Sequence, residues 1–129
     1  MQRKSVLTGR PWEAQAGFSR ATRLGNVVEV SMTSPSGPEG KILYAGDVYR
    51  QTKCALAIIG EALAELGATF EDVARTRMYL TDITRWDEAG RAHAEVFSGI
   101  RPATGWIAVA GFFHPDIAVE VDAVAYLEG

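Results

Sequence analysis

Hydrophobic and polar residues along the chain recur with two different periods, and the longer period marks two helices. Residues 55–66 place apolar side chains at the i, i+3, i+4 and i+7 positions of a helix. Asp47 is suited to cap the start of this helix, and Gly67 is suited to end it. A second apolar stripe with the same period predicts a helix over residues 86–97.

Period-two alternation predicts strands in the rest of the chain. The Gly25-Asn26 dipeptide accepts the positive φ angles of a tight turn, so residues 18–24 and 27–31 should form an antiparallel hairpin. Residues 32–41 are rich in proline, glycine and hydroxyl side chains, which predicts a surface loop. The other predicted strands cover residues 42–44, 74–80, 105–113 and 117–127, with a turn at 114–116 between the last two.

This order of elements predicts an α+β fold. Two helices cover only one face of such a sheet, so we expect a mixed β-sheet with two helices packed on one face. In the last strand, Val124 and Tyr126 share the other face with Glu120. Apolar side chains on an uncovered face indicate that this face packs on another subunit.

Length and charge narrow the class of protein. The 129 residues are expected to form a single domain, 1–129, and carry a formal net charge of −3 without a basic cluster. This argues against a nucleic-acid partner. No apolar run is long enough to span a bilayer, so no membrane partner is expected. The single cysteine, Cys54, cannot form an intrachain disulfide, and the first residues carry no apolar signal core, which together predict a cytoplasmic protein.

The sequence predicts neither a metal site nor a cofactor. It contains two histidines, no HExxH motif, no paired cysteines and no glycine-rich phosphate loop. His93 lies on the apolar stripe of the second helix, where a hydrogen-bonded structural role is favoured over a ligand role. His114 lies in the predicted turn.

Glu120 is the most informative carboxylate. It lies among valines in the last strand, and a carboxylate in such a place must be hydrogen-bonded, paired or raised in pKa. A glutamate in that state can transfer a proton. The alternative to this catalytic role is that Glu120 faces solvent at a strand edge or forms an ion pair with an arginine of a neighbouring strand. Asp122 lies on the same face of the strand as Glu120, and repulsion between the two carboxylates would raise the pKa of Glu120. Among the arginines, Arg20 is the best placed to bind an acidic ligand.

Five segments in order resemble the Rid family of reactive intermediate deaminases, also called YjgF-type proteins and L-PSP endoribonucleases. They are LGN (24–26), ALAELGA (62–68), FEDVARTRMYLTDI (70–83), RPAT (101–104) and VEVDAVA (119–125). The resemblance implies a chorismate-mutase-like fold that forms a homotrimer with small-molecule clefts between subunits.

The resemblance also implies a set of site residues. Glu120 matches the family's catalytic glutamate, which orients a water for attack on an imine. Phe18 and Ser31 match substrate-binding positions, and Thr104 stands where the family has an arginine that grips a substrate carboxylate. Beside it, Gly105 and Trp106 complete the expected substrate-binding set.

Two functions stay open on this basis. The cleft either hydrolyses a reactive imine or enamine that lacks a simple carboxylate, or it binds a metabolite without catalysis in a regulatory trimer. The endoribonuclease or translation-inhibitor role in the family's names is disfavoured by the acidic charge balance.

Overall fold

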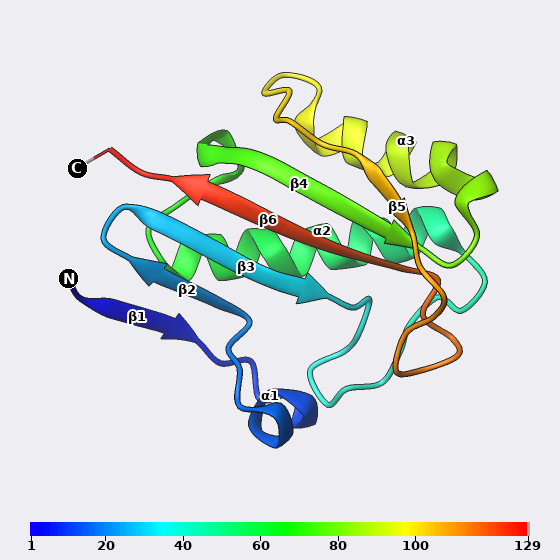
Figure 1. The fold of residues 1–129 in the computed structure, drawn as a ribbon, viewed down its shortest axis with the longest axis horizontal. Helices are drawn as coiled ribbons and strands as arrows, with labels where there is room; N and C mark the ends of the chain where they lie inside the picture. Colours follow the sequence, from blue (N-terminus) through cyan, green and yellow to red (C-terminus); the bar gives the residue numbers. More distant parts are fainter. Residues whose placement is uncertain (129) are drawn as a thin grey trace.

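The computed structural model describes residues 1–128, which form one six-stranded sheet with helices packed against it (Figure 1). The strands are β1 (Arg3–Val6), β2 (Ala21–Leu24), β3 (Val27–Thr33), β4 (Val73–Leu80), β5 (Trp106–Ala108) and β6 (Val119–Tyr126). The helices are α1 (Pro11–Ala16), α2 (Val48–Glu65) and α3 (Trp86–Phe97), with 3-10 turns η1 (Phe70–Asp72) and η2 (Ile83–Arg85). Among the described residues, no helix is both long and apolar enough to cross a membrane.

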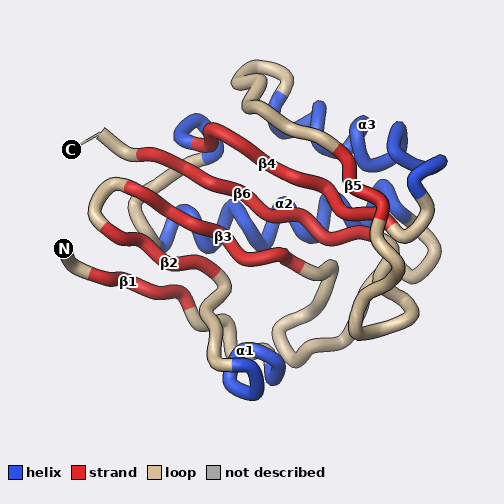
Figure 2. The backbone as a smooth tube through the Cα atoms, in the orientation of Figure 1, coloured by secondary structure: helices blue, strands red, loops and turns tan. Residues whose placement is uncertain are grey.

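The sheet runs in the order β1-β2-β3-β6-β4-β5, and its neighbours are antiparallel except for β4 and β5. Both long helices, α2 and α3, lie behind the sheet in the view of Figure 2, and the opposite face is left open. The predicted α+β architecture with two helices on one face is therefore confirmed, and the short helix α1 is added at the edge near β1 and β2.

Local sequence signals account for the two long helices. The Asp47 side chain accepts a hydrogen bond from the backbone N–H of Arg50 at 2.9 Å, which caps α2 as predicted. Gly67 follows the helix with a φ of 81°, a conformation that glycine adopts without strain. The apolar stripe of α2 packs into the core, and α3 has the predicted bounds.

Strand β6 lies in the centre of the sheet, between β3 and β4. Its core side, formed by Val119, Val121, Ala123 and Ala125, is fully buried. This buried core side and the pairing of both its edges suit β6 to the central position. The predicted strands at 105–113 and 117–127 therefore do not pair with each other, because β5 is short and runs parallel to β4 instead.

Several predictions for the first half of the chain are wrong. Residues 42–44 form no strand, and Ile42 makes an isolated bridge to Ser36 instead. The predicted surface loop is buried where Ser34 and Ser36 lie. The sequence analysis missed β1 and α1, because four residues at a sheet edge and six residues of helix are too short to show a period.

The open face of the sheet is more polar than expected. Asp122 accepts hydrogen bonds from the Tyr79 hydroxyl at 2.7 Å and from Arg77 at 3.3 Å. Val124 is already buried by its neighbours, whereas Tyr126 remains exposed. The open face was expected to be apolar, but it carries a polar network instead, with the exposed Tyr126 near one end of it.

Candidate functional site

A cluster of buried polar side chains lies where α1, the start of β2 and the loop after β3 meet the start of β6. We call it the buried polar cluster, and its members are Arg10, Glu13, Arg20, Ser34, Ser36 and Glu120. Buried polar groups of this kind must be hydrogen-bonded or paired to be tolerated. The cluster gathers two arginines and two glutamates, so its charges balance.

Glu120 is the carboxylate of this cluster that comes from the sheet. It is 5% exposed and accepts a hydrogen bond from the Ser34 hydroxyl at 2.7 Å. Burial raises the pKa of Glu120, while the Ser34 hydrogen bond and the positive charge of Arg20 oppose that rise. The carboxylate is therefore poised to exchange a proton nearer to neutral pH than an exposed glutamate.

Asp122 does not contribute to this shift as the sequence suggested. Its carboxylate is held by Arg77 and Tyr79 on the open face, so its charge is locally compensated. Burial, rather than repulsion from Asp122, raises the pKa of Glu120.

Arg20, which the sequence indicated as the arginine best placed to bind an acidic ligand, is buried in the cluster. It is 1% exposed, it donates from Nη2 to the Met32 carbonyl at 2.7 Å, and its Nη1 lies 3.9 Å from Glu13 Oε2. Its Nε finds no hydrogen-bond partner among residues 1–128. Burial lowers the pKa of Arg20, and the neighbouring Glu13 and Glu120 carboxylates favour its charged form. Arg20 is thus an internal counter-ion of the cluster and is not available as a surface clamp.

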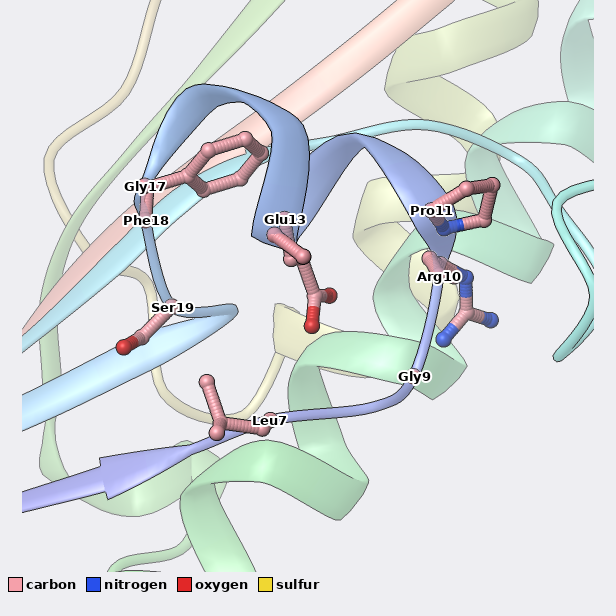
Figure 3. A pocket seen from close by; sticks show the side chains of 9 residues that line it. Leu7, Gly9, Arg10, Pro11, Glu13, Gly17, Phe18 and Ser19 are labelled. Atoms are coloured by element: carbon pink, nitrogen blue, oxygen red, sulfur yellow. The ribbon is translucent and has the colours of Figure 1, made fainter.

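The segment around α1 closes the cluster from outside. The Glu13 carboxylate accepts hydrogen bonds from the Thr8 backbone N–H at 2.9 Å and from the Thr8 hydroxyl at 2.6 Å. Arg10 donates to the Ser36 hydroxyl at 2.7 Å and to its carbonyl at 2.8 Å. Figure 3 shows the Glu13 carboxylate projecting into the space between α1 and the chain at Leu7, where a hollow of about 410 Å³ is present.

Two predicted site residues lie beside this cluster. Phe18 borders the hollow, and its ring centroid lies 5.4 Å from the Arg20 guanidinium carbon. Ser31 lies on β3, and its hydroxyl donates to the Ser19 carbonyl at 2.8 Å. Ser34 was not predicted, although it is the residue that contacts Glu120. The sequence did carry a signal for a buried loop here, because residues 33–36 are small hydroxyl side chains and a proline without any charged residue.

The other three predicted residues lie at the opposite edge of the sheet. Thr104 and Gly105 precede β5, and Trp106 begins it. The Trp106 ring packs edge-on against Trp86 of α3 with a centroid distance of 5.3 Å. Because Trp106 registers with the core residue Met78, it lies on the helix side of the sheet, whereas Glu120 lies on the other side.

One chain therefore does not bring all six predicted residues together. Strands β6 and β4 separate β3 from β5, so Ser31 and Thr104 lie on opposite halves of the sheet. The structure unites Glu120 with Ser34 and Arg20 near Phe18, and it leaves Thr104 and Trp106 apart. The arrangement suits proton transfer by a carboxylate more than nucleophilic attack by a thiol, because burial raises the pKa of the Cys54 thiol. Within residues 1–128, no three His, Cys, Asp or Glu side chains are grouped to hold a metal ion.

Comparison with known proteins agrees with the fold and with the resemblance seen in the sequence. The family model described as Endoribonuclease L-PSP matches residues 8–127. An uncharacterized protein of Streptomyces coelicolor, SCO2049, is 41% identical over 95% of this chain and 91% of its own length. The crystal structure of Rv2704 from Mycobacterium tuberculosis, described as a member of the YjgF/YER057c/UK114 family, superposes with a TM-score of 0.89. It is 42% identical and covers 98% of this chain and 100% of its own.

Proposed function

Because the chain belongs to the endoribonuclease L-PSP family, we propose that it forms a homotrimer whose inter-subunit clefts hydrolyse a small imine or enamine without a carboxylate. The observation that carries this proposal is Glu120, a carboxylate that is 5% exposed, hydrogen-bonded to Ser34 and raised in pKa by burial. A general base with these properties is suited to activate water.

The proposed reaction consumes one water. The Glu120 carboxylate accepts a proton from the water while the water oxygen attacks the imine carbon, and the protonated Glu120 then gives that proton to the imine nitrogen. The resulting carbinolamine then collapses to a carbonyl compound and ammonia. In this scheme Ser34 orients the Glu120 carboxylate by its hydrogen bond. The positive charge of Arg20 favours the ionised carboxylate and so opposes the rise in its pKa.

The separation of the predicted site residues supports a cleft between subunits. Phe18 and Ser31 lie on one half of the sheet, and Thr104 and Trp106 lie at the other edge. A site that uses both groups needs a second copy of the chain. The open sheet face, with its Arg77–Asp122–Tyr79 network and exposed Tyr126, offers a surface for such packing.

The side chains at β5 support a substrate without a carboxylate. Thr104 supplies a hydroxyl where a bidentate arginine would bind a carboxylate, and the loss of such a contact is of order 2 to 5 kcal/mol for an anionic substrate. Trp106 is partly exposed and presents apolar surface next to it. An apolar or aromatic imine fits these groups better than a small 2-imino acid.

The test compares two imines that are generated in the assay. An amine oxidase acting on phenethylamine supplies a neutral aromatic imine, and an amino-acid oxidase acting on phenylalanine supplies the corresponding 2-imino acid. We expect the protein to speed loss of the neutral imine and to act weakly on the anionic one. Glu120→Gln should abolish the effect, because the amide keeps the shape and loses the base.

The control variant is Glu71→Gln, which changes an exposed carboxylate of η1 and should leave the rate unchanged. Sedimentation equilibrium should give a trimer, and a stable monomer at micromolar concentration would contradict the cleft. Binding of the neutral compound without any acceleration would support the alternative of a metabolite-binding trimer. Equal activity of Glu120→Gln and the parent would remove Glu120 from the chemistry.

A further inference from the structure

Three side chains form a hydrogen-bonded chain from the core to the exposed edge of the sheet. His93 of α3 lies with its Nε2 2.7 Å from the hydroxyl of Thr76 on β4. The Thr76 hydroxyl in turn lies 2.7 Å from the hydroxyl of Thr104, before β5. His93 and Thr76 are buried, whereas Thr104 is exposed. We call this set the His93–Thr76–Thr104 relay.

Counting protons fixes the direction of the relay. A threonine hydroxyl has one proton, and Thr76 donates it to the Thr104 oxygen. Thr76 therefore has only a lone pair to offer His93, so the His93 Nε2 must carry a proton and donate it. Burial lowers the pKa of His93, which favours the neutral ring, and the hydrogen bond to Thr76 places the single ring proton of that form on Nε2.

The same count leaves the Thr104 proton available to a ligand. Because the Thr104 oxygen accepts from Thr76, its own O–H is not needed within the relay and is directed away from Thr76. A hydroxyl that is fixed in this way binds a hydrogen-bond acceptor with little loss of rotamer freedom.

The surface next to Thr104 is aromatic. Thr104 contacts Thr76 of β4, and Trp106 pairs with Met78 two residues further along β4, so Thr104 and Trp106 lie on the same side of the sheet. Trp106 is 38% exposed, and its ring rests against the ring of Trp86, which is 51% exposed. Gly90 permits this packing, because a Cβ there would lie 3.2 Å from the Trp106 ring. One directed hydrogen-bond donor therefore lies beside two exposed indole rings.

We propose that the Thr104 hydroxyl is a ligand-binding hydrogen-bond donor that His93 orients through Thr76. The ligand it selects is neutral and carries an imine nitrogen or carbonyl oxygen next to an apolar or aromatic group. His93 and Thr76 are positioning residues in this scheme. The inference rests on the proposed function, because it assigns the substrate class of the same cleft.

The first test reads the direction of the relay without any ligand. His114→Asn leaves His93 as the single histidine of the chain, so its ring nitrogens can be assigned in long-range ¹H–¹⁵N spectra. We expect a protonated Nε2 and an unprotonated Nδ1 at neutral pH. The opposite tautomer would reverse the relay, make Thr104 an acceptor and overturn the proposal.

The second test uses phenylacetamide and phenylacetate as a neutral and an anionic probe of the same shape. Titration followed by amide and indole chemical shifts should place phenylacetamide at Thr104 and Trp106, with weaker binding of phenylacetate. Thr76→Val should weaken phenylacetamide binding roughly fivefold, the effect of one neutral hydrogen bond. Thr52→Val is the matched control, since Thr52 is also buried but donates to its own helix at Val48.

His93 variants separate positioning from packing. His93→Gln keeps an N–H that can reach Thr76 and should retain binding, whereas His93→Leu should weaken it as Thr76→Val does. Equal binding by Thr76→Val and the Thr52→Val control, or no shift at Thr104 on addition of phenylacetamide, would overturn the proposal. Binding at Thr104 without imine turnover would contradict the proposed hydrolysis and leave this inference standing.

Discussion

Replacing Arg20 by methionine tests whether the buried polar cluster depends on an internal cation. Methionine keeps most of the length and apolar volume of the arginine stem but removes the guanidinium. Arg20 is 1% exposed, so water cannot replace the lost charge without opening the structure. Glu13 and Glu120 would then share one buried region without their nearest cation.

The structure sets the expected magnitude. Removing one partner of a buried ion pair costs about 3 to 5 kcal/mol, because the other charge stays buried. The separation of 3.9 Å between Arg20 and Glu13 is long for an ion pair, and Glu13 keeps two hydrogen bonds from Thr8. These two facts place the expected loss in free energy of unfolding near the lower end of that range, at about 3 kcal/mol. For a chain of this size, this corresponds to a fall in Tm of roughly 10 °C.

The assay is urea unfolding followed by circular dichroism. Protein concentration must be held constant, because self-association makes the apparent stability depend on concentration. Adding Glu13→Gln to Arg20→Met should restore part of the loss, since it removes one of the uncompensated charges. Arg50→Met is the control, because the Arg50 side chain is 64% exposed and exposed pairs contribute about 0 to 1 kcal/mol.

Two results would refute this reasoning. Equal stability of Arg20→Met and Arg50→Met would show that the Arg20 guanidinium does not balance the buried charges. A double variant less stable than Arg20→Met alone would show that the Glu13 charge is compensated by groups other than Arg20.

Three further predictions concern the core, a helix end and the pH dependence of stability. Gly60→Ala should lower the free energy of unfolding in urea by about 1 to 3 kcal/mol, because the new Cβ would lie 2.8 Å from the Phe70 ring. The control variant Gly99→Ala places its Cβ in open space and should lower that free energy far less. Asp47→Ala removes the cap of α2 and should lower the free energy of unfolding by about 1 kcal/mol. An unchanged midpoint of urea unfolding would mean that the cap does not stabilise the protein. Glu120→Gln should be more stable than the parent at neutral pH. Native Glu120 has a pKa above its unfolded value, so stability is lost as pH rises through the native pKa. The advantage should vanish below the unfolded pKa of about 4.5, and a gain that is equal at pH 4 and pH 8 would argue against a titrating Glu120.

The sequence by itself determined the elements whose signals are local. The i, i+3, i+4 spacing and the Asp47 cap identified α2, and the same period identified α3 with its observed bounds. Period-two alternation identified β4 and β6, and Gly25-Asn26 identified the turn between β2 and β3. These features are set by side chains a few residues apart, so they can be read from a single chain.

Only the tertiary structure decided which strands pair and which polar groups meet. Glu120 contacts Ser34 across 86 positions of sequence, and β5 pairs with β4 instead of the strand that follows it. The burial of Arg20 depends on α1, a helix of six residues with too few turns to show a period. Alternation shows which side of a strand a residue occupies, but not what packs against that side. Burial and the pKa shifts that follow from it depend on contacts between segments far apart in the chain, and those contacts exist only once the sheet has formed.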